Sequence, residues 1–538
     1  MRRNKGIVGS QSKGYLLKSG FYGSITALAF APFNVFPIFL LTFARLFVRI
    51  LEIKDIKSLL KEVFCFFFCM HVACLYWIVY PLSLNLSKHW ILIPIAITLI
   101  PTYFSMFLLI PVWIMWKRTH GNSLQMRNKF TEYAIKPVMF ASLFNLIMLF
   151  YGHFFPGFPW LLPGYVWCCH EIFLQTLSVY GIYGLSFITM LIAGFGGLSF
   201  VQYKLGDIKK SKNSAIISTI LFLFIVLFGY NRLANHKTEF TDKKIRVVQC
   251  NISQKNKSNS RLAFFNLQEH VIRSQHESKL DFVVWPEASV PYLYRENFEQ
   301  LNHRLKSILN DGEYLLAGAV REDLNTQKIH NSVIVINHKG QNIANYNKSR
   351  LLPFGEYIPF RRYVPLKSIA SDIGDFDAGT QADIFKINGM KIIFAICYEI
   401  AFPNGFMPYV LEPKITNDLG LRVNQEADLI VNITNDGWFG LTTEPFQHLQ
   451  ISRTRAIETG LPLVRATNYG ISAIFDAYGR EISRIPIDQA GVIDANIPKK
   501  TDCPFNRIDG NFWIALGLFL LTLLSMGIEI KNKNSNTT

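Results

Sequence analysis

The feature that most constrains the fold of this chain is a series of long apolar stretches within its first 232 residues. A helix needs roughly 20 consecutive apolar residues to cross a bilayer core of about 30 Å. The chain as a whole is 50% hydrophobic and only 17% charged, which excludes intrinsic disorder. We expect about eight transmembrane helices, at residues 16–33, 35–52, 62–82, 90–116, 136–155, 177–202, 214–231 and 511–530.

The basic residues indicate how such helices are oriented. Lys and Arg cluster before the first stretch and in every second connection after it, whereas residues 137–203 contain none. This alternation is typical of cytoplasmic loops, so it predicts cytoplasmic N- and C-termini and places residues 243–500 outside the cytoplasm. Topology therefore explains the formal net charge of +17 better than nucleic-acid binding does. The small residues Ala27, Ala29 and Ala31 also fit a signal-peptide cleavage site, and this alternative stays open.

Residues 243–500 show a different pattern. Short Val- and Ile-rich runs, typical of strands buried on both faces of a sheet, alternate with helical stretches. The pattern predicts an α/β layered domain between a transmembrane domain at 1–232 and a C-terminal transmembrane helix at 511–530. The runs that indicate strands include 245–252, 281–287, 313–320, 391–400 and 428–434, and the helical stretches include 260–278, 297–310 and 445–459.

Three reactive side chains follow expected strands. Glu287 closes VVWPE, Lys348 lies in YNKSRLLPFGEYIP, and Cys397 follows IIFAI. Because sites in open α/β sheets form at the carboxyl edge, we expect the three to converge there. A thiol that transfers an acyl group needs a base and a stabilised oxyanion, and these residue types supply both without a metal or organic cofactor. Taken singly, Cys397 fits a buried core cysteine better than a nucleophile. Glu287 alone also fits a helix-start carboxylate, and Lys348 alone a solvated loop charge.

These motifs resemble those of one enzyme superfamily. WPE, NK-x-x-LLPFGEYIP, CYE and NDGWFG are similar to motifs of the carbon–nitrogen hydrolase (nitrilase) superfamily, whose Glu-Lys-Cys triad lies on an α-β-β-α sandwich. Together with the apolar stretches, the whole chain is similar to the apolipoprotein N-acyltransferase family. The segments GFPWL at 157–161 and YGIYGLSF at 180–187 extend the resemblance into the membrane part.

The resemblance also implies roles for individual residues. It implies Glu287 as general base, Lys348 as the group that stabilises thiolate and oxyanion, and Cys397 as nucleophile. For Glu356, one of the supporting positions, a purely structural carboxylate is an alternative role. For Trp438 and Phe439, packing in the core is an equal alternative. The implied supporting and substrate-binding residues are Glu356, Tyr398, Glu399, Trp438 and Phe439.

The same resemblance implies a reaction. It is the transfer of a fatty acyl chain from a membrane phospholipid to the N-terminal amino group of an S-diacylglyceryl-cysteine apolipoprotein, through a Cys thioester, during lipoprotein maturation. The implied place is the bacterial inner membrane, with a periplasmic catalytic domain, no cofactor and no nucleic-acid partner. Two alternatives are a membrane-tethered amidase or nitrilase that acts on a small amide, and a transporter with an inactive nitrilase-like sensor. Against transport, the apolar stretches show no buried ion pair.

Two segments depart from the family pattern. In CNISQKNKS, residues 250–258, Ser258 stands where family members commonly carry a Trp, which alters an expected substrate contact. The stretch 402–427, between CYE and DLIVNIT, is longer than is usual in the family. Because it follows the nucleophile, it either reshapes the entrance to the site or forms an inert surface loop.

Overall fold

The fold comes from a computed structural model that describes residues 4–120, 130–154, 157–363, 374–380, 384–403, 427–507 and 510–534. The chain divides into two compact units. The first comprises residues 1–79, 89–235 and 509–538, and the second comprises residues 80–88 and 236–508.

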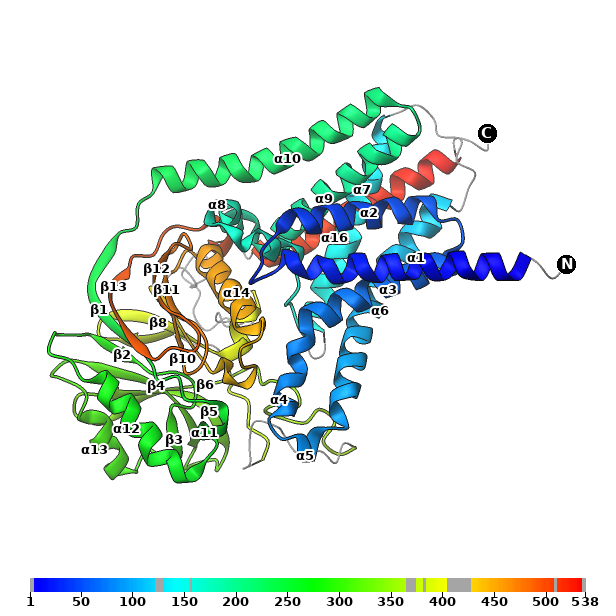
Figure 1. Ribbon diagram of the computed structural model, residues 1–538. Coiled ribbons are helices and arrows are strands. Elements are labelled where there is room, and N and C mark those ends of the chain that lie inside the picture. The colour runs from blue at the N-terminus through cyan, green and yellow to red at the C-terminus, as the bar shows by residue number, and fades with distance from the viewer. Residues whose placement is uncertain are drawn as a thin grey trace. The chain divides into compact units, whose positions relative to one another are not determined.

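The first unit is built of long helices (Figure 1). Five helical segments within the described ranges are long and apolar enough to cross a membrane, namely Ile56–Ser83, Leu92–His120, Ala134–His153, Leu177–Lys204 and Ile208–Asn235. In chain order the long helices are α1 (Asn4–Thr26), α2 (Phe36–Glu52), α3 (Ile56–Leu75), α6 (Leu92–His120), α7 (Phe130–His153), α9 (Leu177–Lys204), α10 (Ile208–Asn235) and α16 (Gly510–Asn534). Short helical turns lie between them in the chain, among them η3 (Pro163–Cys169) and α8 (Glu171–Leu174). The turns α4 (Tyr80–Ser83) and α5 (Leu86–His89) fall on residues 80–88 of the second unit, apart from His89.

The expected count of about eight membrane-spanning helices is not confirmed. The predicted spans 16–33, 35–52 and 511–530 fall on α1, α2 and α16, which are helices but do not meet the length and apolarity of a span in the described part of the chain. Helix α2 has only 17 residues, fewer than the roughly 20 apolar residues that cross the bilayer core. In α16 the residues whose side chains are described, Trp513–Ser525, form an apolar helix.

The prediction that the apolar stretches hold no buried ion pair is wrong. The Glu62 side chain of α3 is buried, and its carboxylate lies 2.8 Å from the Arg49 guanidinium and 3.5 Å from that of Arg45, both on α2. Ser19 of α1 also donates a hydrogen bond to Glu62, at 3.1 Å. A buried carboxylate needs such partners because burial removes its hydration. The lack of an ion pair therefore no longer argues against transport.

The second unit contains two β-sheets. The first sheet has the order β13-β1-β2-β4-β5-β6, with β3 beside β4, and the second has the order β12-β11-β10-β9-β8-β7. Pairing is parallel for β1–β2, β2–β4, β3–β4, β8–β9 and β9–β10, and antiparallel elsewhere. The strands are β1 (Phe240–Gln249), β2 (Phe282–Val284), β3 (Val290–Tyr294), β4 (Tyr314–Glu322), β5 (Ile329–Asn337), β6 (Asn342–Asn347), β7 (Ile384–Ile387), β8 (Met390–Ile396), β9 (Leu429–Thr434), β10 (Leu463–Thr467), β11 (Ser472–Phe475), β12 (Glu481–Ile485) and β13 (Gly491–Pro498).

Apolar side chains arrange these sheets in layers. Residues such as Val247 and Phe282 of the first sheet pack against Phe394 and Val431 of the second, in one fully buried cluster. Helices α12 (Ala263–Ser274) and α13 (Glu299–Lys306) cover the outer face of the first sheet, and α14 (Glu444–Thr459) covers that of the second (Figure 1). Burying one face of each helix and both faces of each sheet gives four layers. The expected α-β-β-α sandwich is confirmed.

Candidate active site

The three predicted catalytic residues lie together at the ends of three strands. Glu287 follows β2, Lys348 directly follows β6, and Cys397 directly follows β8. The Lys348 Nζ atom lies 3.8 Å from a carboxylate oxygen of Glu287. The charges of both residues act on the Cys397 thiol: the Glu287 carboxylate raises its pKa, and the Lys348 ammonium lowers it. The first two residues come from one sheet and the third from the other, so the site joins the two sheets of the sandwich.

The segment that carries Glu287 lies directly against β4. The backbone N–H of Gly318 donates to the carbonyl oxygen of Pro286 at 3.2 Å, and a Cβ atom at 318 would stand only 2.3 Å from that oxygen. Glycine is therefore the residue that lets this segment approach so closely. Glu287 itself is 7% exposed. This burial raises the pKa of its carboxyl group, while the Lys348 ammonium acts in the opposite direction.

Two carboxylates share one ammonium group and one amide. Lys348 Nζ donates to Glu356 at 2.9 Å, and Nδ2 of Asn331 on β5 donates to Glu287 at 2.7 Å and to Glu356 at 2.9 Å. The backbone N–H of Leu352 donates to the other oxygen of Glu356 at 2.7 Å. Burial alone would lower the pKa of Lys348, but the nearby charges, above all those of the Glu356 and Glu287 carboxylates, raise it above its usual value. Lys348 is therefore a cation under all ordinary conditions.

Cys397 stands at a sharp turn between β8 and the 3-10 helix η5 (Cys397–Ala401). Its φ angle is +54°, in the left-handed region that costs a non-glycine residue of order 1–3 kcal/mol. Burial, followed by the nearby Glu287 charge, raises the pKa of its thiol well above the usual value, while Lys348 and a hydrogen bond with Thr434 lower it. The resting thiol is therefore protonated, and a reaction through its thiolate would need a base to take the proton.

Tyr398 and Glu399 tie this turn to the loop after Lys348. The Tyr398 hydroxyl donates to the carbonyl oxygen of Leu351 at 3.0 Å, and its ring lies 5.7 Å from Lys348 Nζ. Glu399 has no exposed surface and accepts hydrogen bonds from the backbone N–H groups of Ser349 at 2.8 Å and Ile396 at 2.8 Å. It also accepts from the Tyr346 hydroxyl at 3.0 Å. These contacts make both residues parts of the frame that fixes the turn.

The remaining predicted positions lie on neighbouring segments. Trp438 ends the 3-10 helix η7 (Asp436–Trp438) after β9, Phe439 follows it, and both are half-buried. Ser258 is exposed and follows the short helix α11 (Gln254–Lys257), where its hydroxyl accepts from Gln254 at 3.3 Å. Of the long stretch after CYE, residues 404–426 lie outside the described residues.

One basic residue at the site had no distinctive signal in the sequence. The Lys257 Nζ atom donates to the backbone carbonyl oxygen of Glu287 at 2.6 Å. Burial lowers its pKa to about 8, although the Glu287 charge opposes this. Lys257 lies in CNISQKNKS next to Ser258, among other polar residues of a short helical turn, so periodicity gave no reason to single it out.

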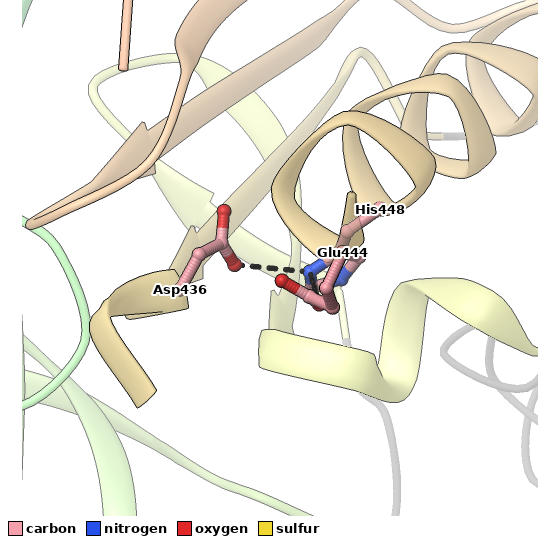
Figure 2. Close-up of side chains that lie close together, drawn as sticks. All are labelled: Asp436, Glu444 and His448. Atoms are coloured by element: carbon pink, nitrogen blue, oxygen red, sulfur yellow. Dashed lines mark hydrogen bonds and ion pairs between the residues drawn. The ribbon is translucent and has the colours of Figure 1, made fainter. Parts of the chain in front are cut away.

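A second charged cluster lies beside Cys397. Asp436, Glu444 and His448 are buried, and each offers a ligand atom within 4.8 Å of the others (Figure 2). Such a set has the chemistry of a metal site. However, the Arg465 guanidinium already lies 2.8 Å from Asp436, so a protein cation balances this carboxylate. Arg465, together with hydrogen bonds from His448, holds the pKa of Asp436 below its usual value despite burial. We therefore identify none of the three as a metal ligand.

Comparison with known proteins covers both units. The family model described as apolipoprotein N-acyltransferase N-terminal domain matches residues 22–195, and the carbon–nitrogen hydrolase model matches residues 244–501. The chain is 32% identical to the apolipoprotein N-acyltransferase of Rickettsia bellii, over 95% of this chain and 97% of that protein. It is 30% identical to the enzymes of that name from Rickettsia typhi, over 93% and 96%, and Brucella melitensis, over 86% and 84%. Since the similarity runs through the apolar helices and the sandwich alike, the chain belongs to the apolipoprotein N-acyltransferase family.

Proposed function

We propose that this protein moves a fatty acyl chain from a membrane phospholipid to the N-terminal amino group of an S-diacylglyceryl-cysteine apolipoprotein. In this proposal Cys397 is the nucleophile, Glu287 the general base and Lys348 the oxyanion stabiliser. The observation that carries it is the buried Glu287–Lys348 pair, 3.8 Å apart, which acts on the thiol at the end of β8. The family's relatives, named for N-acyl transfer to apolipoproteins, supply the substrate class.

The first half-reaction forms a thioester. Glu287 takes the proton from the Cys397 thiol as the sulfur attacks the ester carbonyl carbon of the phospholipid. The charge that develops on the carbonyl oxygen is stabilised by the Lys348 ammonium, which stays protonated beside Glu356. When the carbon–oxygen bond breaks, the leaving oxygen takes the proton from Glu287, and lysophospholipid departs.

The second half-reaction uses the same groups on an amine. The amino group of the apolipoprotein attacks the thioester carbon, and Glu287 accepts its proton. The carbon–sulfur bond then breaks, and Cys397 leaves as a thiolate that takes the proton back from Glu287. The raised pKa of Glu287 suits this double role, because the group must both accept and return a proton near neutral pH.

The apolar helices give the reaction its setting. Five segments among the described residues are long and apolar enough to cross a membrane, and both proposed substrates are anchored in lipid. Extracting an acyl chain into water would cost about 0.8 kcal/mol per CH₂ group, a cost that a membrane-held enzyme avoids. We place the sandwich on the periplasmic side of a bacterial inner membrane because of the alternation of basic residues. A reporter fused after residue 240 is expected to be active outside the cytoplasm, and cytoplasmic activity would contradict this topology.

Transfer between two defined substrates tests the reaction. Purified protein in mixed micelles is given phospholipid with a labelled acyl chain and a peptide that begins with diacylglyceryl-cysteine. We expect the label to reach the peptide amine with wild-type protein and not with Cys397→Ala. Label released only as free fatty acid would instead favour the hydrolase alternative, with water as the acceptor. Transfer by Cys397→Ala at the wild-type rate would exclude the thioester mechanism.

A further inference from the structure

Two side chains from other elements of the fold contact the backbone carbonyl oxygen of Cys397, the proposed nucleophile. Nε2 of His448, on α14, lies 3.3 Å from the Cys397 carbonyl oxygen, and Nδ2 of Asn432, on β9, lies 3.5 Å from it. These two contacts act on the residue whose φ angle of +54° requires support from its surroundings. Both come from buried side chains, so neither is exchanged for water.

The geometry determines which ring nitrogens of His448 carry protons. A carbonyl oxygen only accepts hydrogen bonds, so Nε2 must be the donor in its contact with Cys397. Nδ1 faces two carboxylate oxygens, 3.1 Å away on Asp436 and 3.4 Å away on Glu444 (Figure 2). Because the Asp436 carboxylate, whose pKa is lowered by Arg465 and by its hydrogen bond with His448, can only accept a hydrogen bond, Nδ1 must also carry a proton. The ring is then an imidazolium that donates in both directions.

The charges around the ring support this protonation state. The charged groups that face it are Asp436 on η7, Glu444 on α14 itself and Arg465 on β10, all buried. Burial and Arg465 lower the pKa of His448, but its hydrogen bonds to the two carboxylates outweigh them and raise it. Burial, followed by the Asp436 charge, raises the pKa of Glu444 to about 7. Above that pH, two carboxylates, one imidazolium and one guanidinium sum to zero charge. A divalent cation in place of the proton would leave a net positive charge buried, which is costly.

We propose that His448 is a positioning residue for the nucleophile: fixed by Asp436 and Glu444, it donates Nε2–H to the Cys397 carbonyl oxygen and holds that residue in its left-handed conformation. Its role is to keep the thiol aimed at the substrate, and it transfers no proton in the reaction. This inference rests on the proposed function, since it takes Cys397 as the nucleophile. Loss of the hydrogen bond from His448 moves the Cys397 sulfur, and a misplacement near 1 Å costs about 10²-fold in rate.

Alkylation of Cys397 by iodoacetamide tests the inference without lipid. The rate is followed by peptide mass spectrometry across the neutral pH range in wild type, His448→Gln and His448→Asn. Glutamine places an amide N–H near the position of Nε2, whereas asparagine is too short to reach the carbonyl oxygen. His276→Gln is the matched control, because His276 is another buried imidazole beside a carboxylate, 2.9 Å from Glu313, and it lies outside the site.

We expect His448→Gln to react within about threefold of wild type and His448→Asn about 10²-fold more slowly, with equal losses of thermal stability. In wild type the rate per thiolate should fall as pH rises through the pKa of His448, because a neutral ring keeps its one proton on Nδ1, beside the two carboxylates, and Nε2 no longer donates to Cys397. His448→Gln should lack this fall. Wild-type reactivity in His448→Asn, equal slowing in both variants at equal stability, or identical wild-type and Gln pH profiles would overturn the proposal.

Elemental analysis separates this role from metal binding. We expect the purified wild-type protein and His448→Gln to contain the same substoichiometric amounts of divalent metal. One equivalent of metal that only the wild type retains would overturn the proposal. Because alkylation needs no lipid, a failure of phospholipid to acylate the enzyme would contradict the proposed function while leaving this result unaffected.

Discussion

Replacing Gly318 by alanine tests whether the position of Glu287 controls the rate of acyl transfer. A Cβ atom at 318 would lie 2.3 Å from the carbonyl oxygen of Pro286 and 2.6 Å from Cα of Glu287. Because non-bonded atoms prefer separations of about 3.5 Å, this segment must move away from β4 by about 1 Å. A displacement of that size costs about 10²-fold in rate, which corresponds to about 2.7 kcal/mol.

The assay mixes the enzyme with excess phospholipid and follows acyl-enzyme formation by intact-mass spectrometry at successive times. We expect Gly318→Ala to acylate about 10²-fold more slowly, with a loss of about 1–3 kcal/mol in unfolding free energy from overpacking. Gly491→Ala is the matched control, because Gly491 starts β13 of the same sheet and its added Cβ would meet Ile485 at an ordinary 3.7 Å. Wild-type acylation by a stable Gly318→Ala protein would refute the reasoning.

Three further perturbations follow from the same contacts. In the proposed mechanism Glu287 acts as a base only when ionised, so activity is lost as pH falls through its raised pKa. The hydrogen bond from the Asn331 amide lowers this pKa, so removing that amide should move the acid limb of the acylation profile to higher pH, and an unmoved limb contradicts the assignment. Lys257→Met should move the limb in the same direction, because the Lys257 charge also lowers that pKa; a profile identical to wild type excludes this role. Glu399→Gln should lower the unfolding free energy, measured by chemical denaturation, by about 1.5–3 kcal/mol, whereas the control Glu277→Gln, at an exposed position, should not change it measurably. Equal unfolding free energies of Glu399→Gln and wild type would show that the hydrogen bonds to Ser349 are dispensable.

The layered domain was predictable because continuous apolar runs in the sequence indicate its buried strands. Each of the Val- and Ile-rich runs singled out in the sequence corresponds to a strand, for example 428–434 to β9 and 391–400 to β8. Their direction was not predictable, since apolar runs encode burial and not pairing. Lys348 reaches the same edge as Glu287 because β4, β5 and β6 are joined by two antiparallel pairings, which bring β6 parallel to β4.

The number of membrane spans was harder to predict for a different physical reason. A window of apolar residues reports hydropathy, but it does not report where a helix ends or what its charged residues contact. Helix α2 ends after 17 residues, and its Arg49 pairs with Glu62 of α3, a contact between residues far apart in the chain. Such a pairing only becomes visible when the helices are packed.

The residues of the site also fall into a group that the sequence indicated and a group that only the fold reveals. The triad stood out because each member ends a strand within a distinctive group of residues, and the structure brings the three together. Asn331, Lys257 and His448 did not stand out, because each lies on a different strand or helix and reaches the site only through the fold. The candidate nucleophile was therefore visible in the sequence, whereas the groups that set its pKa and its backbone angle were not.

The most direct test of the account is the mass of the enzyme after incubation with phospholipid alone, compared between wild type and Cys397→Ala. The account predicts that wild type gains the mass of one fatty acyl chain and that the gain maps to Cys397. The Cys397→Ala protein should gain nothing. A wild-type protein with a reduced Cys397 that acquires no acyl chain, or an equal gain on the alanine variant, would contradict the thioester mechanism at its first step.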